Sequence, residues 1–381
     1  MTLQQQAKPA ADSSEEYAFL GCEEALAEAV LRAGCKVFSV YPMTPINEVN
    51  EHFLEKAPDY GAISLACESE MEGGWYAYGA AKAGARVMAG STGVGMALMG
   101  EMVSYAARDG APIVFSHWTR GGPGTGPTGS PSQGDYAQAV KSPANGDFKC
   151  IVFAPSTVQE LVDLTYEAFD IAELVEGPVT VLTDYSIAKS TEVLKLPPRK
   201  DVALRTNGLT GARDRGGRKE MLVQDEGGIT SSTAHGVPDE EKATRFIHLE
   251  EATLRRFERY NRIQPRVEEV LAEDAVLNVV AVGTMARIVR VVVRQMRDEG
   301  LKVGLVRPIT LFPFPEETMR KLAAKSTLLV TELSVGQMAE DVQLAIGKKP
   351  LLYGRPGGVV PTLAEISYEL HRVYEETGGA K

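Results

Sequence analysis

Short apolar runs alternate with amphipathic stretches along most of the chain, and this alternation predicts its secondary structure. The apolar runs that we expect to form strands lie at residues 36–40, 62–67, 87–90, 112–117, 151–154 and 178–182. Apolar residues recur on one side of a helix at residues 21–33, 45–53, from 69 onward, 96–107 and 157–171. This order of strands and helices indicates a parallel, doubly wound α/β sheet that is covered on both faces.

The pattern changes twice after residue 190. Residues 190–245 contain few apolar residues and many glycines and prolines, which favours a long connection or lid, and residues 250–270 read as a charged helix. From residue 275 the alternation returns, with strands expected at 276–282, 302–307 and 326–331 and helices at 286–299, 316–324 and 336–346. We therefore expect a disordered terminus (1–15), a first α/β domain (16–190), a connecting segment with a helix (191–270) and a smaller α/β domain (271–381).

Polar side chains that could form a site follow directly after four of the predicted strands. These residues are Thr44, Glu70, Thr92 and Arg120. In open parallel sheets, ligands bind beyond the carboxyl ends of the strands, so we expect the four residues to converge on one edge. Arg120 is also the single cation in a loop rich in glycine, where the backbone can approach a ligand closely.

Each of these residues also has a simple structural explanation. A glutamate such as Glu70 in the first turn of a helix is favoured by the helix dipole by ~0.3–1 kcal/mol. Arg120 could bind a carboxylate through two parallel hydrogen bonds, or it could bind carbonyl groups of its own loop. Thr44 is most simply a helix N-cap, with Pro45 in the first helical position. The residues alone leave these alternatives open.

The stretch Gly90-Ser-Thr-Gly-Val-Gly95 invites comparison with a dinucleotide-binding loop. The GxGxxG spacing is absent, and no acidic residue ends a strand about 20 residues later, as that motif requires. We therefore interpret it as a tight strand-to-helix turn that packs near a ligand. His117 and Trp118 are expected to be packing residues, because no Ser–His–Asp or Cys–His arrangement accompanies them.

Composition narrows the class of protein. The net charge of -11 argues against nucleic acid or an anionic membrane as the main partner. The four cysteines form no CxxC pair, so we expect no iron–sulfur cluster, structural zinc or other metal site in this chain. The first residues lack a signal-peptide pattern, and the most apolar run, 276–293, is interrupted by Arg287 and Arg290. These features predict a cytoplasmic protein.

Several distinctive motifs follow one another over most of residues 17–370. Among them are Tyr41-Pro-Met-Thr-Pro45, Glu68-Ser-Glu70, Arg120-Gly-Gly-Pro-Gly124, Pro131-Ser-Gln-Gly-Asp135, Glu332-Leu-Ser-Val-Gly-Gln337 and Tyr353-Gly-Arg-Pro-Gly-Gly358. Together these collinear motifs resemble the α subunit of 2-oxoacid:ferredoxin oxidoreductases. The stretch Gly336-Gln-Met-Ala-Glu-Asp-Val342 is most similar to the 2-oxoisovalerate and 2-oxoglutarate members.

The resemblance implies a fold, cofactors and partner subunits. The fold would be a pyrimidine-type thiamine-diphosphate-binding domain, followed by a smaller α/β domain like the C-terminal domain of transketolase. Thiamine diphosphate would be shared with a β subunit that holds the diphosphate and Mg²⁺, since this chain lacks a GDG-then-Asn stretch. A γ subunit and a ferredoxin-like δ subunit, or an external ferredoxin, would complete the enzyme and carry iron–sulfur clusters.

The resemblance also implies a reaction and a role for each candidate residue. The enzyme would decarboxylate a 2-oxo acid oxidatively to an acyl-CoA and carbon dioxide, with coenzyme A as cosubstrate and electrons passing to the iron–sulfur clusters. Glu70 would be catalytic and bond the pyrimidine ring nitrogen of the cofactor, while Thr44 and Arg120 would hold the substrate carboxylate. The further candidates are Tyr41, Pro42, Ser91 and Thr92 for the cofactor, and Gly121, Gly122 and Asn145 for the substrate loop.

Three departures from the family pattern leave the 2-oxo acid undetermined. Asn145 stands where the family often has a histidine, Thr128-Gly-Ser-Pro131 differs from the usual loop, and residues 227–237 differ from the usual stretch. Thr44 argues against an oxalate-type member, in which a second cation would be expected at this position. Two other readings stay open: a transketolase-like or decarboxylase-like enzyme without electron transfer, and a structural paralogue without activity.

Overall fold

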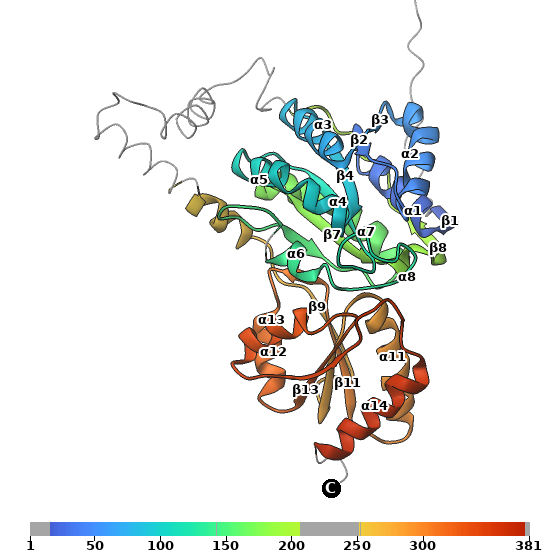
Figure 1. The fold of residues 1–381 in the computed structure, drawn as a ribbon, viewed down its shortest axis with the longest axis vertical. Helices are drawn as coiled ribbons and strands as arrows, with labels where there is room; N and C mark the ends of the chain where they lie inside the picture. Colours follow the sequence, from blue (N-terminus) through green and yellow to red (C-terminus); the bar gives the residue numbers. More distant parts are fainter. Residues whose placement is uncertain (1–15, 142, 206–250, 252, 378–381) are drawn as a thin grey trace, which may run out of the picture.

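The computed structural model describes residues 16–141, 143–205, 251 and 253–377. The terminus predicted to be disordered (1–15) lies outside the described residues, as do residues 206–250 of the predicted connection. Two lobes are visible in Figure 1: a first lobe formed by residues 16–205 and a second lobe formed by residues 267–377. No helix in the described ranges has both the length and the apolar character needed to cross a lipid bilayer.

A seven-stranded sheet forms the centre of the first lobe, and it contains the six strands predicted there. Its order is β12-β6-β7-β5-β4-β2-β3, and all pairs are parallel except β12 with β6. The strands are β2 (Val37–Val40), β3 (Ile63–Ala66), β4 (Val87–Thr92), β5 (Val114–Thr119), β6 (Ile151–Phe153), β7 (Val179–Asp184) and β12 (Thr310–Phe312).

Helices cover both faces of this sheet, as its apolar strands require. On β6, Ile151 and Phe153 join the core under α1, α2 and α7, whereas Val152 joins the core under α3 and α5. Successive strand side chains thus enter opposite cores. The helices of this lobe are α1 (Cys22–Arg32), α2 (Asn47–Tyr60), α3 (Glu70–Lys82), α4 (Gly93–Leu98), α5 (Gly100–Arg108), α6 (Tyr136–Val140), α7 (Val158–Val175) and α8 (Tyr185–Ala188).

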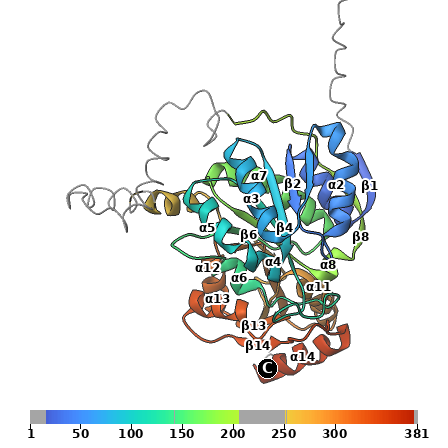
Figure 2. The ribbon, with the colours of Figure 1, turned by 45° about the horizontal axis from the view of Figure 1, so that its top comes forward.

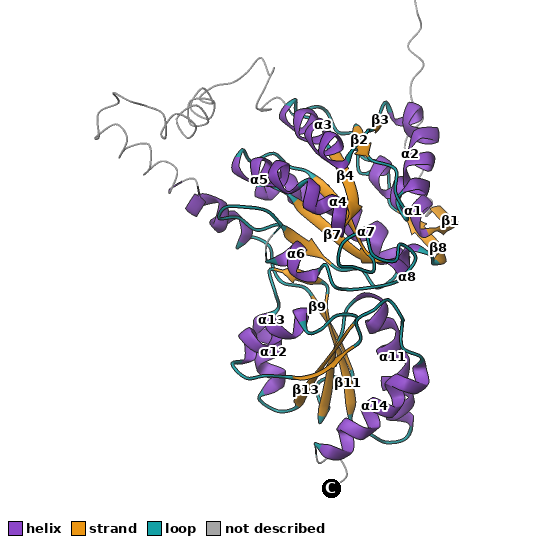
Figure 3. Ribbon diagram, viewed as in Figure 1, coloured by secondary structure: helices purple, strands orange, loops and turns teal. Residues whose placement is uncertain are grey.

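The second lobe repeats this layered design around a five-stranded sheet of order β14-β13-β10-β11-β9 (Figure 3). On β13, Leu329 packs with α11 and α14, while Leu328 and Val330 pack with α12 and α13. The strands are β9 (Val267–Val270), β10 (Leu277–Val280), β11 (Val303–Pro308), β13 (Thr327–Glu332) and β14 (Leu351–Gly354). The helices are α11 (Gly283–Asp298), α12 (Glu316–Ala323), α13 (Gln337–Ile346) and α14 (Leu363–Glu376).

Three expectations about elements are wrong. Thr44 does not cap a helix: it lies in a turn closed by a 2.8 Å hydrogen bond from the Ile46 N–H to the Met43 carbonyl, and α2 begins only at Asn47. The helix expected at 96–107 is divided into α4 and α5 at Met99. The charged helix expected at 250–270 ends at residue 260, because Pro265 follows and residues 267–270 form β9.

Several elements were not predicted. β1 (Glu16–Gly21) and β8 (Thr191–Leu196) form a separate two-stranded antiparallel ribbon. β12, β14 and α14 were also missed. β12 comes from the chain of the second lobe and yet completes the sheet of the first lobe, so the two lobes share a layer. The predicted domain boundaries stay a prediction.

Candidate functional site

The carboxyl ends of four neighbouring strands, β3, β2, β4 and β5, meet at one edge of the first sheet. The register aligns Val40 of β2 with Ala66 of β3 and with Gly90 of β4, and Thr92 with Trp118 of β5. The segments that leave these strands therefore begin side by side. They carry Tyr41 to Thr44, Glu70, Ser91 with Thr92, and Arg120.

Arg120 joins two of these segments. Its side chain is buried, with 6% of its surface exposed, and its Nη1 donates a 2.8 Å hydrogen bond to the backbone carbonyl of Thr44. The Arg120 Nε is buried and finds no acceptor among the described residues. Arg120 thus binds a neighbouring loop rather than only its own, and it keeps a buried donor that a ligand can use.

The loop after β2 is packed onto the end of β4 through Met43. The hydroxyls of Ser91 and Thr92 lie 3.1 and 3.2 Å from the Met43 sulfur, which is a weak acceptor. Tyr41 is half-buried in this loop, and the flanking Pro42 and Thr44 are exposed. Tyr41 and Pro42 were proposed from the sequence as cofactor residues together with Ser91 and Thr92. They lie on the loop that Met43 packs onto these two hydroxyls.

Glu70 begins α3 and is 7% exposed. Ser69 caps the helix by accepting a 3.2 Å hydrogen bond from the Glu72 N–H, which fixes the first turn and the side-chain direction of Glu70. Its side chain packs directly on α4, where a methyl group added at Gly95 would overlap Ser91 Oγ and lie 2.6 Å from Glu70 Cγ. A buried carboxyl group is therefore held beside the Ser91–Gly95 turn.

A cavity of about 390 Å³ opens beside this turn. Arg120 is the one cation and Asp135 the one anion among the described residues that line it, and the rest of its wall is largely apolar or glycine. A methyl group added at Gly93 would lie 2.5 Å from the Asp135 carboxylate, so glycine permits this close approach. The lining residues are Thr92, Gly93, Val94, Ala97, Leu98, Arg120, Gly121, Gly122, Pro123, Gly124 and Asp135.

The sequence candidates differ in how closely the structure ties them to this cavity. Thr92, Arg120, Gly121 and Gly122 line it. Glu70 does not line it, but it packs beside Gly95, which follows the lining residue Val94 in the chain. Asn145 does not line it: it is exposed on a loop, where its carbonyl accepts a 2.8 Å hydrogen bond from the Ser104 hydroxyl of α5.

No role was predicted for Asp135 from the sequence, although this residue ends the motif Pro131-Ser-Gln-Gly-Asp135. Its signal was a lone acidic residue that follows the glycine loop in the stretch Pro131–Asp135. The Asp135 Oδ2 lies 3.8 Å from the His117 Nε2, and both atoms are buried without a hydrogen bond to a described residue. His117 and Trp118 are buried in β5, in agreement with the packing role expected for them.

In the described part of the chain, His, Cys, Asp and Glu side chains nowhere form a group of three or more that could hold a metal ion. The arrangement instead combines a buried cation, a buried carboxyl group, two hydroxyls and an apolar wall. Such a set is chemically suited to bind a small carboxylate and to present an acidic group to a second ligand.

Two family models match the chain, one for each lobe. "Pyruvate flavodoxin/ferredoxin oxidoreductase, thiamine diP-bdg" matches residues 28–253, and "Pyruvate:ferredoxin oxidoreductase core domain II" matches residues 275–366. Together with the observed parallel sheets, these matches confirm the predicted fold class.

Two curated relatives are similar along almost their whole length. Ketoisovalerate oxidoreductase subunit VorB of Methanothermobacter thermautotrophicus is 38% identical over 351 residues, which cover 91% of this chain and 94% of the relative. The 2-oxoglutarate synthase subunit KorA of the same organism is 32% identical and covers 95% and 97%, respectively.

A solved structure has a similar fold. The 2-oxoglutarate:ferredoxin oxidoreductase from Magnetococcus marinus, with 2-oxoglutarate, coenzyme A and succinyl-CoA bound, superposes with a TM-score of 0.80 at 23% identity. The match covers 98% of this chain and 68% of that chain. Both lobes and their relative placement therefore recur in that protein.

Proposed function

Because this chain belongs to the pyruvate flavodoxin/ferredoxin oxidoreductase family, we propose that it supplies the acidic half of a site for oxidative decarboxylation of a 2-oxo acid. The products would be an acyl-CoA and carbon dioxide, with electrons passed to iron–sulfur clusters. The family assignment favours this reading over a transketolase-like enzyme without electron transfer, because the named relatives are oxidoreductase subunits.

One observation carries the proposal: a buried carboxyl group and a buried cation follow strands that end at the same edge of the first sheet, on either side of the β4 end. Glu70 packs on the Ser91–Gly95 turn, and Arg120 lines the cavity that opens beside it. A 2-oxo acid needs a cation for its carboxylate, and its reaction needs an acidic group at the coenzyme.

The described residues fit one half of thiamine diphosphate. Gly95 lets the Glu70 side chain pack closely against the Ser91–Gly95 turn. From this position Glu70 would bond the ring nitrogen of the aminopyrimidine. When bound, thiamine supplies the electron sink for decarboxylation. Arg120, with its buried unpaired Nε, and Thr44 would orient the substrate carboxylate.

The diphosphate half requires a partner. The cavity has one cation, and the described residues form no acidic cluster for Mg²⁺. We therefore assign the diphosphate and Mg²⁺ to a β subunit, and the iron–sulfur clusters to a γ subunit, a ferredoxin-like δ subunit or an external ferredoxin. The assembled enzyme would work in the cytoplasm.

For the substrate, we favour a branched-chain 2-oxo acid. Val94, Ala97, Leu98 and Pro123 give the cavity an apolar wall, and the single cation Arg120 is needed for the first carboxylate. A second carboxylate, as in 2-oxoglutarate, would have no positive partner among the described lining residues. The relative with the higher identity is a ketoisovalerate oxidoreductase subunit, which agrees with this choice.

The test is to co-express the chain with its partner subunits, purify the assembly and screen 2-oxo acids with coenzyme A and a viologen dye. We expect dye reduction that depends on coenzyme A and is fastest with 2-oxoisovalerate. An assembly that binds thiamine diphosphate but reduces no dye with any 2-oxo acid would contradict the proposal. Faster turnover of 2-oxoglutarate would contradict only the substrate choice.

A further inference from the structure

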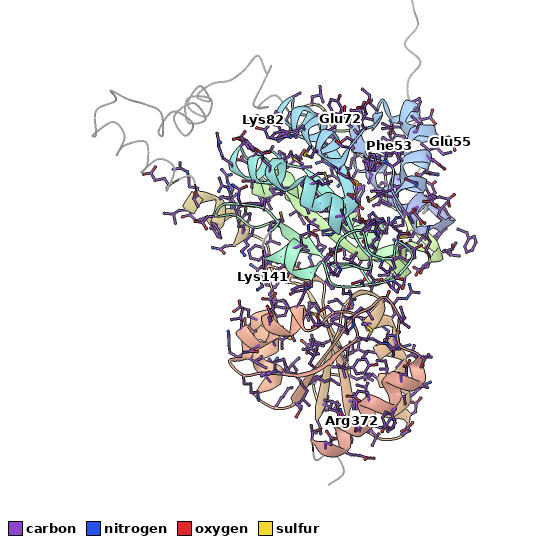
Figure 4. All side chains as sticks on the ribbon, in the orientation of Figure 1. Phe53, Glu55, Glu72, Lys82, Lys141 and Arg372 are labelled. Carbon is purple, nitrogen blue, oxygen red and sulfur yellow. The ribbon has the colours of Figure 1, made fainter. Side chains whose placement is uncertain are left out.

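The segment that follows the glycine loop, residues 132–141, lies between the cavity and the second lobe. Its short helix α6 lies between the first lobe and α13 in two views (Figures 1 and 2). Lys141, at the end of this segment, forms an ion pair with Asp341 of α13 at the junction of the lobes (Figure 4). The Tyr136 hydroxyl donates a 2.6 Å hydrogen bond to the same carboxylate.

Gln133 joins the start of this segment to the residues that follow β13 and β10 in the second lobe. Its backbone N–H donates to the Leu333 carbonyl at 3.0 Å, and the Leu333 N–H returns a 2.9 Å hydrogen bond to the Gln133 side-chain oxygen. The Gln133 Nε2 donates to the Val282 carbonyl at 3.0 Å. All these groups are buried, so the start of the segment is fixed by fully paired polar atoms.

Gln337, the first residue of α13, brackets Asp135 from the other side. Its Nε2 donates a 2.7 Å hydrogen bond to the carbonyl of Gly134, and its side-chain oxygen accepts a 2.7 Å bond from the Ala137 N–H. One side chain of the second lobe therefore holds the backbone immediately before and shortly after Asp135.

The direction of the Asp135 side chain affects the charge near Arg120, because both residues line the same cavity. The described structure has no ion pair between them: the Asp135 carboxylate faces Gly93 and the His117 ring instead. A carboxylate free to turn toward the buried Arg120 cation would be attracted strongly in a cavity with an apolar wall. It would then compete with the carboxylate of a substrate.

We propose that Gln337 is a positioning residue that keeps the Asp135 carboxylate away from Arg120, so that Arg120 stays available for the substrate. The second lobe thereby acts on the site without contributing to the cavity wall. This inference rests on the proposed function in one respect, which is that Arg120 receives the carboxylate of a 2-oxo acid.

The test replaces Gln337 by methionine, which has a similar length but makes neither hydrogen bond. In the assembled enzyme, Q337M should raise the KM for the 2-oxo acid about tenfold, with kcat and the affinity for thiamine diphosphate changed less than about twofold. The matched control is Q343M, because Gln343 is exposed on the same helix.

A second substitution separates positioning from simple structural damage. If the released Asp135 competes for Arg120, then D135N should restore a low KM in the Q337M background, because the competing charge is gone. A double variant with a KM as high as that of Q337M, or higher, would overturn the proposal. An unchanged KM in Q337M alone would overturn it as well.

Hydrogen exchange provides a measurement that does not depend on activity. In the purified wild-type chain, the amides of residues 130–138 should be protected, and Q337M should speed their exchange while Q343M should not. An assembly without any 2-oxo acid oxidation would defeat the proposed function but leave this measurement intact. Equal exchange in Q337M and wild type would defeat the positioning role even in an active enzyme.

Discussion

Burial and packing, rather than residue type alone, distinguish Arg120 and Glu70 from the other charged residues near them. Arg120 is 6% exposed and keeps an unpaired buried donor, whereas Glu72, one turn from the Ser69 cap, accepts bonds from the Glu68 N–H and the Tyr76 hydroxyl at the surface. A buried donor without a partner is costly, and a bound carboxylate would satisfy the one on Arg120.

Arg120 should not be replaceable by lysine. A lysine retains the charge but loses the planar fork, which bonds the Thr44 carbonyl and would bond a substrate carboxylate at the same time. We expect R120K to raise the KM for the 2-oxo acid by about tenfold to a hundredfold, the range for a lost hydrogen bond to a charged group. The exposed Arg294 on α11 provides the control substitution R294K. Equal KM values for R120K and wild type would remove Arg120 from substrate binding.

For single residues, the sequence predicted part of the candidate site. The order of strands was enough to bring Thr44, Thr92 and Arg120 to one edge, because parallel strands end together. The turn at Thr44 could not be foreseen, since threonine before proline suits a cap and a turn equally well. Asp135 acquires its meaning only from Gly93, His117 and Gln337, which are distant in sequence.

Among the elements, the approach of α4 to α3 depends on Gly95. G95A would place a methyl group over Ser91 Oγ and 2.6 Å from Glu70 Cγ, so either the helix or the glutamate must move. We expect activity to fall at least tenfold while the chain still folds, since the shift is local. The measurement is the catalytic rate together with the unfolding midpoint.

Gly79 offers the matched control within α3. It is exposed, and no heavy atom lies within 4 Å of a methyl group added there. G79A should therefore keep full activity and stabilise the chain by about 0.4–1 kcal/mol, because alanine favours a helix. Equal activities for G95A and G79A would show that the packing of Glu70 on α4 is unimportant.

Helices and strands with a regular pattern of apolar residues were predicted well. Elements whose formation depends on pairing with a segment far away in the sequence were not. The continuous apolar runs of β4, β5 and β7 are buried on both faces and were found from the sequence alone. β1 and β8 pair across about 170 residues, and their ribbon has an exposed face, so neither carries a buried run. β9 reads Val-Glu-Glu-Val, so its two valines are three residues apart, as on one face of a helix, and it was mistaken for part of a helix.

For the whole molecule, an ion network centred on Arg307 joins the two lobes. Arg307, in β11, is 1% exposed and pairs with Glu160 of α7 and with Glu268 of β9, the latter at 2.7 Å. Arg290 of α11 also bonds Glu268 at 2.6 Å. The hydrogen bonds from Arg290 and Arg307 lower the pKa of Glu268 from 4.5 to about 2, against the opposing effect of burial.

The sign of this pKa shift gives a stability prediction. A carboxyl group with a pKa lowered on folding contributes stability above its unfolded pKa, and that contribution is lost as pH falls from about 4.5 to about 2. We expect E268Q to lower the free energy of unfolding at pH 7 by about 1.5–3 kcal/mol and to flatten its decline in this window. The exposed Glu273 supplies the control E273Q. A decline as steep in E268Q as in wild type would assign the acid sensitivity elsewhere.

Under the proposed function, the whole molecule supplies one half of a catalytic site. Its first lobe brings Glu70 and Arg120 to one sheet edge, and its second lobe holds the adjoining segment through Gln133 and Gln337. Arg120 is the single cation among the described lining residues, and under the proposed function another subunit would bind the coenzyme diphosphate. The central claim is therefore that Glu70 serves a coenzyme whose phosphates a partner binds.

The most direct measurement of that claim is single-turnover release of labelled carbon dioxide from a 2-oxo acid labelled at carbon 1. It compares the assembled wild-type enzyme with E70Q, and with E72Q as the control. We predict that E70Q slows release by about a hundredfold or more while its affinity for thiamine diphosphate stays measurable, and that E72Q behaves as wild type. Release from E70Q at the wild-type rate would contradict the account.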